Sequence, residues 1–181
     1  MRIYATRRAP IPLEDRPLEE VDSFVYLGSV VSKAGGADED VKVRIGKAQC
    51  AFNMLRNTWR NRHLRLSTKL TLFNSNVKSV LLYGSETWKH TKALDHKLQV
   101  FINRCLRNIL RIRWPDRISN QDLWKRTRQK PITTTIKERK WKWIGHTLRR
   151  DQPNITRHVL DWNPRGQRKE RKTSNHLEEN S

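Results

Sequence analysis

The sequence predicts a mainly α-helical fold: a short N-terminal β-hairpin, then a helical bundle and a second, smaller helical segment. Apolar residues recur at steps of three and four over long stretches, which is the spacing of one face of a helix. β-branched and aromatic residues cluster around Gly28, which favours paired strands. Pro10, Pro12 and Pro17 disfavour both helix and central strand in residues 1–20, where we expect a linker or a fragment edge.

The β-hairpin is predicted over residues 21–36. Phe24 and Tyr26 occupy alternate positions just before a β-branched run that surrounds Gly28. Gly35-Gly36 ends the paired segment, because two glycines favour neither strand nor helix.

A helix of about five turns is predicted to follow the hairpin. Asp38, Glu39 and Asp40 stand where the positive end of its dipole lies, so we expect them to favour the helix start rather than to bind metal. Its apolar stripe, with Trp59 expected in the core, consists of Val41, Ile45, Ala48, Phe52, Leu55 and Trp59.

Two further helices complete a bundle over residues 37–113. Ser67 is a candidate N-cap for the first, which we expect to end at Tyr83-Gly84 after a stripe of Leu70, Phe73, Val77 and Val80 or Leu81. The second begins near Thr91. Its side chains predicted to face the core are Leu94, Leu98, Phe101, Cys105 and Ile109. Its outward face carries four cations that we name the basic rail: Lys97, Arg104, Arg107 and Arg111.

The second helical segment is predicted over residues 114–163. Trp114-Pro115-Asp116 ends the preceding helix, and Ser119 is placed to cap a short helix that holds Leu123 and Trp124. A longer helix is expected over about residues 132–149. Residues 164–181 are basic and lack apolar periodicity, so we expect a disordered tail.

The charge balance points to a polyanionic partner. The chain has 38 Lys and Arg against 18 Asp and Glu, a net charge of +20, far more than solubility requires. The first forty residues hold five basic and eight acidic side chains, so the remaining 141 carry +23. Nucleic acid is the leading partner. A ribosomal or membrane-surface protein could share this charge, but seven Trp fit packed helices or base stacking better.

No catalytic centre is evident in the sequence. The histidines are scattered, and no P-loop, nucleophile elbow or triad can be assembled. Cys50 and Cys105 lie far from other ligand types, and we expect both to be buried thiols. We therefore expect no catalytic residue, bound metal, cofactor or small-molecule substrate. No apolar run is long enough for a membrane span and no secretory signal is seen, which predicts an intracellular protein with no membrane partner.

The predicted helix over residues 132–149 offers a second basic surface. Cations alternate with indoles there, which suits phosphate contacts combined with base stacking. The alternative is that both Trp pack inward, and the sequence does not decide between the two. The candidate nucleic-acid contacts of this surface are Arg139, Lys140, Trp141, Lys142, Trp143, His146 and Arg149.

Several ordered blocks resemble the region after the palm in reverse transcriptases of LINE-type (non-LTR) retrotransposons. They run in the family's order over about residues 21–163, which makes the resemblance more specific than one short motif. The blocks are residues 23–29, 44–48, 76–88, 101–107, 114–120 and 139–149.

The resemblance implies a role for each part of the chain. The hairpin corresponds to the primer grip, which makes Phe24, Tyr26, Leu27 and Gly28 candidate primer-grip residues. The helices over residues 37–113 correspond to the thumb, which holds template–primer duplex through its backbone. The full-length family enzyme is an RNA-directed DNA polymerase with an endonuclease, uses Mg²⁺, and acts in the nucleus.

The fingers, the palm with its paired aspartates, and the endonuclease have no counterpart in this sequence. We therefore expect a non-catalytic fragment that binds RNA or DNA duplex and is nuclear. One alternative is an independent DNA-binding protein with a helix-turn-helix over residues 119–149. Another is the inactive product of a pseudogene.

Overall fold

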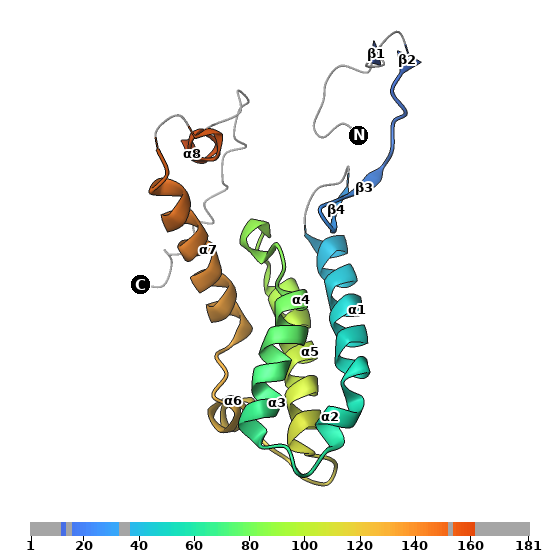
Figure 1. Cartoon of the computed structure of the whole chain (residues 1–181), viewed down its shortest axis with the longest axis vertical. Helices are drawn as coiled ribbons and strands as arrows, with labels where there is room; N and C mark the ends of the chain where they lie inside the picture. Colours follow the sequence, from blue (N-terminus) through green and yellow to red (C-terminus); the bar gives the residue numbers. More distant parts are fainter. Residues whose placement is uncertain (1–11, 14–15, 33–36, 152–153, 162–181) are drawn as a thin grey trace, which may run out of the picture. The chain divides into compact units, whose positions relative to one another are not determined.

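The computed structural model describes residues 12–13, 16–32, 37–151 and 154–161 (Figure 1). They form the mainly helical fold with an N-terminal hairpin that the sequence predicts. The chain divides into two compact units, residues 1–143 and 144–181. The tail expected over residues 164–181 lies outside the described residues.

Two antiparallel strand pairs occur in the N-terminal part. β1 (Pro12–Leu13) pairs with β2 (Arg16–Pro17) inside the segment expected to be a linker. β3 (Ser23–Tyr26) pairs with β4 (Ser29–Ser32), which confirms the predicted hairpin. Leu27 and Gly28 connect β3 to β4 with φ angles of 48° and 78°. Two positive φ angles are the signature of a tight two-residue hairpin turn, and glycine adopts such an angle without steric cost.

The first predicted helix is interrupted once. α1 (Asp38–Met54) ends at Leu55, and α2 (Arg56–Arg60) continues the apolar stripe. Trp59 is buried as expected, and its indole Nε1 donates across the interruption to the carbonyl of Phe52 at 2.8 Å. The Phe52 and Trp59 rings also stack with centroids 5.1 Å apart. The interruption thus keeps the stripe facing the core.

The next helical stretch has three parts: α3 (Leu66–Leu72), the π-helical η1 (Phe73–Lys78) and α4 (Ser79–Leu81). Its apolar stripe is buried as predicted at Phe73, Val77 and Leu81. The cap prediction was wrong, because the N-cap is Arg65 and Ser67 lies inside the first turn. Gly84, with φ 75°, precedes the short 3₁₀ helix η2 (Ser85–Thr87).

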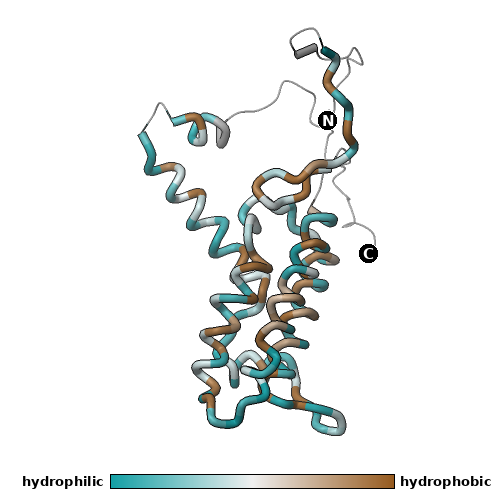
Figure 2. Tube along the Cα trace, turned by 45° about the vertical axis from the view of Figure 1, so that its right-hand side comes forward, coloured by the Kyte–Doolittle hydropathy of each residue, from teal (hydrophilic) through white to brown (hydrophobic). Residues whose placement is uncertain are grey.

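α5 (Lys92–Leu110) is the central helix of the bundle. The Thr91 side chain accepts the backbone N–H of Leu94 at 3.2 Å and so caps the helix. Every side chain predicted to face inward is buried: Leu94, Leu98, Phe101, Cys105 and Ile109. Figure 2 shows such hydrophobic residues in brown, recurring along the helices.

The first unit extends beyond the boundary expected near residue 113. α6 (Asn120–Thr127) is capped by Ser119, as predicted, and α7 (Ile132–Leu148) follows. Leu123 and two isoleucines of α7 belong to the same core as α1 and α5. Trp124 Nε1 also donates to Asn103 Oδ1 at 2.8 Å. Residues 114–143 therefore complete the bundle instead of forming a separate segment. α8 (Ile155–Asp161) lies in the second unit.

Candidate nucleic-acid interface

The basic rail lies on α5, but its four cations differ in environment. Lys97 and Arg104 are exposed, and neither makes a hydrogen bond or ion pair within the described residues. Arg107 is half-buried and donates to Asn120 Oδ1 at 2.7 Å. Arg111 lies past the helix end in the left-handed region, with φ 60°, and donates to the carbonyl of Arg60. The prediction that all four face outward was therefore incomplete for two of them, because Arg107 also bridges to α6 and Arg111 also ties α5 to α2.

A shallow groove of about 440 Å³ accompanies the rail. Arg104, Arg107 and Arg111 line it together with neutral side chains such as Asn103 and Val100. Among the described residues, no carboxylate lies in the lining. An anion in this groove would meet cations without competition from acidic side chains.

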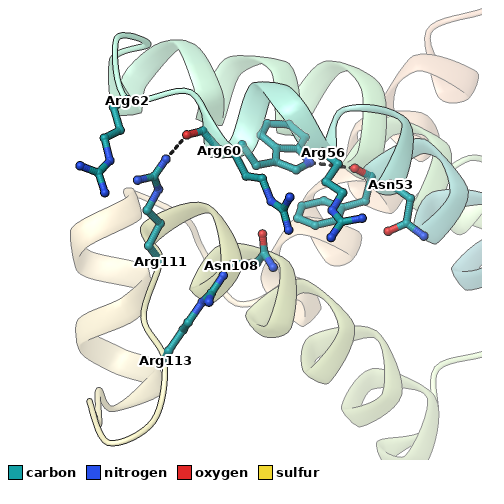
Figure 3. Close-up of a pocket in the computed structure, with 9 residues that line it drawn as sticks. Asn53, Arg56, Arg60, Arg62, Asn108, Arg111 and Arg113 are labelled. Carbon is teal, nitrogen blue, oxygen red and sulfur yellow. Dashed lines mark hydrogen bonds between the residues drawn. The ribbon is translucent and has the colours of Figure 1, made fainter.

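A second cavity, which we name the arginine cleft, lies where α2 meets the end of α5. It measures about 590 Å³, and the part of the chain that the structure describes contributes no acidic side chain to its lining. Figure 3 shows Arg56 and Arg60 reaching from α2 toward Asn108 of α5, while Arg113 approaches from the chain that follows α5. The lining consists of Phe52, Asn53, Arg56, Trp59, Arg60, Arg62, Asn108, Arg111 and Arg113.

A buried lysine supports the loop that borders the arginine cleft. Lys69 Nζ donates to the carbonyls of Trp59 and Asn61 at 3.1 and 2.6 Å. Burial lowers the pKa of Lys69 below the ordinary 10.5, and the positive charge of Arg111 lowers this pKa further. The positive charges of Lys69 and Arg111 therefore repel each other, and neither forms an ion pair with an acid among the described residues.

The β3–β4 hairpin is fixed to the bundle through Asp40. This carboxylate is 5% exposed; its Oδ1 accepts the backbone N–H of Val30 at 3.1 Å, and its Oδ2 accepts Trp88 Nε1 at 2.8 Å. Arg44 Nε lies 3.8 Å from Oδ1. The interpretation of Asp40 as a helix-start charge was therefore incomplete, because its main role is to join three segments.

Arg44 holds the turn of the hairpin. One of its terminal nitrogens donates to the carbonyl of Gly28 at 2.8 Å and to Ser29 Oγ at 3.1 Å. Its guanidinium carbon also lies 4.5 Å from the centre of the Tyr83 ring. The candidate primer-grip residues Phe24, Tyr26 and Leu27 are exposed beside this anchored turn. The hairpin thus presents apolar side chains from a fixed base, and Figure 2 colours its hydrophobic residues brown.

The basic surface of α7 is partly used inside the protein. Arg139 Nε donates to Glu86 Oε1 at 3.1 Å, so this arginine is paired. Trp141 is 71% exposed, which excludes the alternative that it packs in the core. Trp143 is 40% exposed, Lys140 is half-buried and Lys142 is exposed.

His146 and Arg149 belong to the second unit, and both are exposed there. Because they lie across the unit boundary, they are not assigned to a common surface with residues 139–143. The candidate set on α7 is thereby reduced to Lys140, Trp141, Lys142 and Trp143.

The two cysteines have different environments. Cys105 is buried as predicted, and this burial raises its pKa to about 12. Cys50 is exposed, so the prediction that it is buried was wrong: it lies between the stripe positions Ala48 and Phe52 but points away from them. The described residues contain no group of three or more His, Cys, Asp or Glu arranged to hold a metal ion. None of the helices in the described ranges is both long and apolar enough to cross a membrane.

Residues 51–83 match a family described as a domain of unknown function (DUF6451). The matched stretch includes Arg56, Arg60 and Arg62 of the arginine cleft. The chain is also similar to a putative uncharacterized transposon-derived protein of Caenorhabditis elegans, with 27% identity over 157 residues. This match covers 84% of the chain and 56% of the relative, so the chain spans about half the length of the curated relative it matches. The homologue suggests a transposable-element origin. No solved structure matches the chain.

Sequence reasoning missed most of the arginine cleft. Only Arg111 was among the candidate contacts, whereas Arg56, Arg60, Arg62 and Arg113 were not. A signal was present, because residues 56–65 contain four arginines and one histidine without any acid. That density shows a basic segment, but only the fold shows that it lies opposite the end of α5.

Proposed function

We propose that this chain is a non-catalytic C-terminal part of a LINE-type retrotransposon reverse transcriptase and that it holds template–primer nucleic acid through its phosphates. The ordered sequence blocks support the family, and the transposon-derived relative supports an origin in a mobile element.

The basic rail is the observation that carries this proposal. From Lys97 to Arg107 the helix rises about 15 Å, which matches roughly four phosphates of one strand at about 3.4 Å each along a duplex axis. Arg104 and Arg107 line an acid-free groove, and Lys97 lies exposed two helical turns before Arg104. Phosphate contacts of this kind fix the position of a duplex without reading its sequence.

The exposed hairpin and the exposed Trp141 add apolar and stacking contacts to the phosphate contacts of the basic rail. Tyr26 and Leu27 offer apolar contacts to a primer end, and the Trp141 indole offers a stacking face to an unpaired base. The chemistry of DNA synthesis, with its Mg²⁺ ions, would belong to the palm of a full-length enzyme, and that enzyme would act in the nucleus. The isolated chain would add no nucleotides to a primed template.

The test measures duplex affinity against salt concentration by fluorescence anisotropy. If five to seven cations neutralise phosphates, the logarithm of the association constant falls with the logarithm of salt concentration at a slope of about −4 to −6. The double variant Lys97→Gln/Arg104→Gln should weaken all duplexes alike and make this slope shallower by about 2.

The matched control is Lys42→Gln/Lys89→Gln, which removes two exposed charges outside the rail. It should leave the slope within about 0.5 of the parent value, since the slope counts only the phosphates that are contacted. Equal effects of the two variants would reject the rail. Strong preference for one duplex sequence would instead favour a helix-turn-helix made of α6 and α7, which follow each other across residues 128–131.

A further inference from the structure

Most arginines of the arginine cleft lack a hydrogen-bond or ion-pair partner within the described part of the chain. Arg111 is the exception, because its side chain donates to the carbonyl of Arg60 at the end of α2 and so has a structural role. The side chains of Arg56, Arg60, Arg62 and Arg113 make no hydrogen bond or ion pair within the described part of the chain. Four guanidinium groups therefore line one cavity without a partner among the residues that the structure describes.

The concentration of charge is too high for an ordinary backbone phosphate. A phosphodiester carries one negative charge, whereas a terminal phosphomonoester carries about −1.5 to −2 at pH 7 and three acceptor oxygens. Guanidinium groups bind such oxygens in a bidentate manner, and several can share one dianionic group. The ligand that matches the arginine cleft best is thus a terminal phosphate.

The volume and the position of the cavity suit binding of the end of a nucleic-acid strand. Its volume of about 590 Å³ is that of a small-molecule site and suits one nucleotide rather than a length of duplex. The cleft shares Arg111, Asn108 and Arg113 with the groove of the basic rail. A strand whose phosphates follow the rail would reach the cleft at the C-terminal end of α5.

We propose that the arginine cleft binds the terminal phosphate of a nucleic-acid strand whose backbone lies along the basic rail. This inference rests on the proposed function and adds a second, end-specific site to it. Asn108 lies among the arginines and offers an amide donor and acceptor to the sugar or base of the terminal nucleotide. Arg56 and Arg60 are the main phosphate ligands, because Figure 3 shows both side chains reaching toward Asn108, and neither side chain makes a hydrogen bond or ion pair among the described residues.

The experiment compares strands of one sequence that differ only at their ends: 5′-phosphate, 3′-phosphate or hydroxyl groups. The full chain should bind one phosphorylated form about tenfold more tightly than the hydroxyl form, because the extra charge meets several unpaired guanidiniums. The form that gains identifies the strand end. Inorganic phosphate, added as competitor, should reduce this preference without abolishing binding.

The variant Arg56→Gln/Arg60→Gln should lower the preference to less than about twofold, because Gln keeps a polar side chain but removes the bidentate charge. Circular dichroism checks that its helix content equals that of the parent. The matched control is the rail variant Lys97→Gln/Arg104→Gln, which should weaken both forms equally and retain the preference.

The outcomes separate the two proposals. Equal binding of phosphorylated and hydroxyl ends, or a preference that survives in the cleft variant, would overturn the end site while salt-dependent rail binding still supports the proposed function. A chain that binds no strand at all would overturn both.

Discussion

Arginine is buried and paired at one end of the first unit, and it is exposed and unpaired with acids at the other. At the N-terminal end of α1, Arg44 is buried, hydrogen-bonded and held beside Asp40. Near α2 and the C-terminal end of α5, the arginine cleft gathers five arginines without an acid in its lining. A buried and paired arginine serves the fold, whereas a cluster of unpaired arginines adds only repulsion to it. Net charge alone therefore does not locate a binding site in this protein, whereas the presence or absence of a partner for each charge does.

Replacing Asp40 should give the largest effect on stability. Asp40→Ala leaves the buried Arg44 charge uncompensated and removes the acceptor of Val30 N–H and Trp88 Nε1. We expect a loss of about 3–5 kcal/mol in the free energy of unfolding. Urea denaturation followed by circular dichroism measures it. Asp38→Ala, an exposed acid in the same turn, should cost less than about 1 kcal/mol, and equal losses would refute the anchoring role.

Leu123→Ala tests whether α6 belongs to the bundle. Leu123 is fully buried in the core shared with α1 and α5. The substitution should destabilise by about 2–5 kcal/mol through the cavity it leaves. The whole first unit should still unfold in one transition, seen both by circular dichroism and by tryptophan fluorescence. A separate early transition confined to α6 and α7 would restore the boundary near residue 113.

The buried Lys69 predicts how stability depends on pH. Its pKa is lowered in the folded state, so between that pKa and 10.5 the unfolded chain binds more protons than the folded one. Stability from this group therefore rises with pH over that window. Lys69→Met should make this rise in the free energy of unfolding smaller. Part of the rise should remain, because burial also lowers the pKa of Lys78.

The measurement is the difference in unfolding free energy between parent and Lys69→Met across alkaline pH. Cys105 acts in the opposite direction above its ordinary pKa of 9.0, but it is common to both proteins and cancels in the difference. The exposed control Lys42→Met should leave the parent profile unchanged. A rise of the same size in Lys69→Met and parent would show that Lys69 does not contribute.

The arginine cleft should show the smallest effect on stability. Arg56→Gln/Arg60→Gln removes two exposed charges whose side chains have no partner among the described residues, so we expect a change within about 0.5 kcal/mol, of either sign. Thermal unfolding in chloride buffer measures it. A loss of several kcal/mol would mean that these arginines support the fold, and the contrast with Arg44 would disappear.

The periodic parts of the fold could be predicted from sequence because one helical face repeats its apolar residues. The stripes through Ala48, Phe73 and Leu98 are buried as expected. The interruption at Leu55 could not be predicted, because the apolar spacing continues through it unchanged. The hydrogen bond from the Trp59 indole to the Phe52 carbonyl, which spans the interruption, is likewise not encoded in that spacing.

The candidate site was less predictable than the fold. Spacing placed Lys97 and Arg104 on one outward face, which the structure agrees with. Spacing could not show that Asp40 meets Trp88 or that Arg139 meets Glu86, because these partners are about fifty positions apart. Unpaired charges were therefore hard to distinguish from paired ones before the fold was known.

The turn of the hairpin has a consequence for how its sequence can change. Leu27 has a φ angle of 48° and is 73% exposed, although a branched side chain is strained in that region and gains little by exposure. Asparagine or glycine would fit the same turn more easily, by roughly 1 kcal/mol. Stability alone would thus let this position drift away from leucine. A population of sequences selected only for folding should lose Leu27 early, whereas one selected for contact with a partner should keep an apolar side chain there.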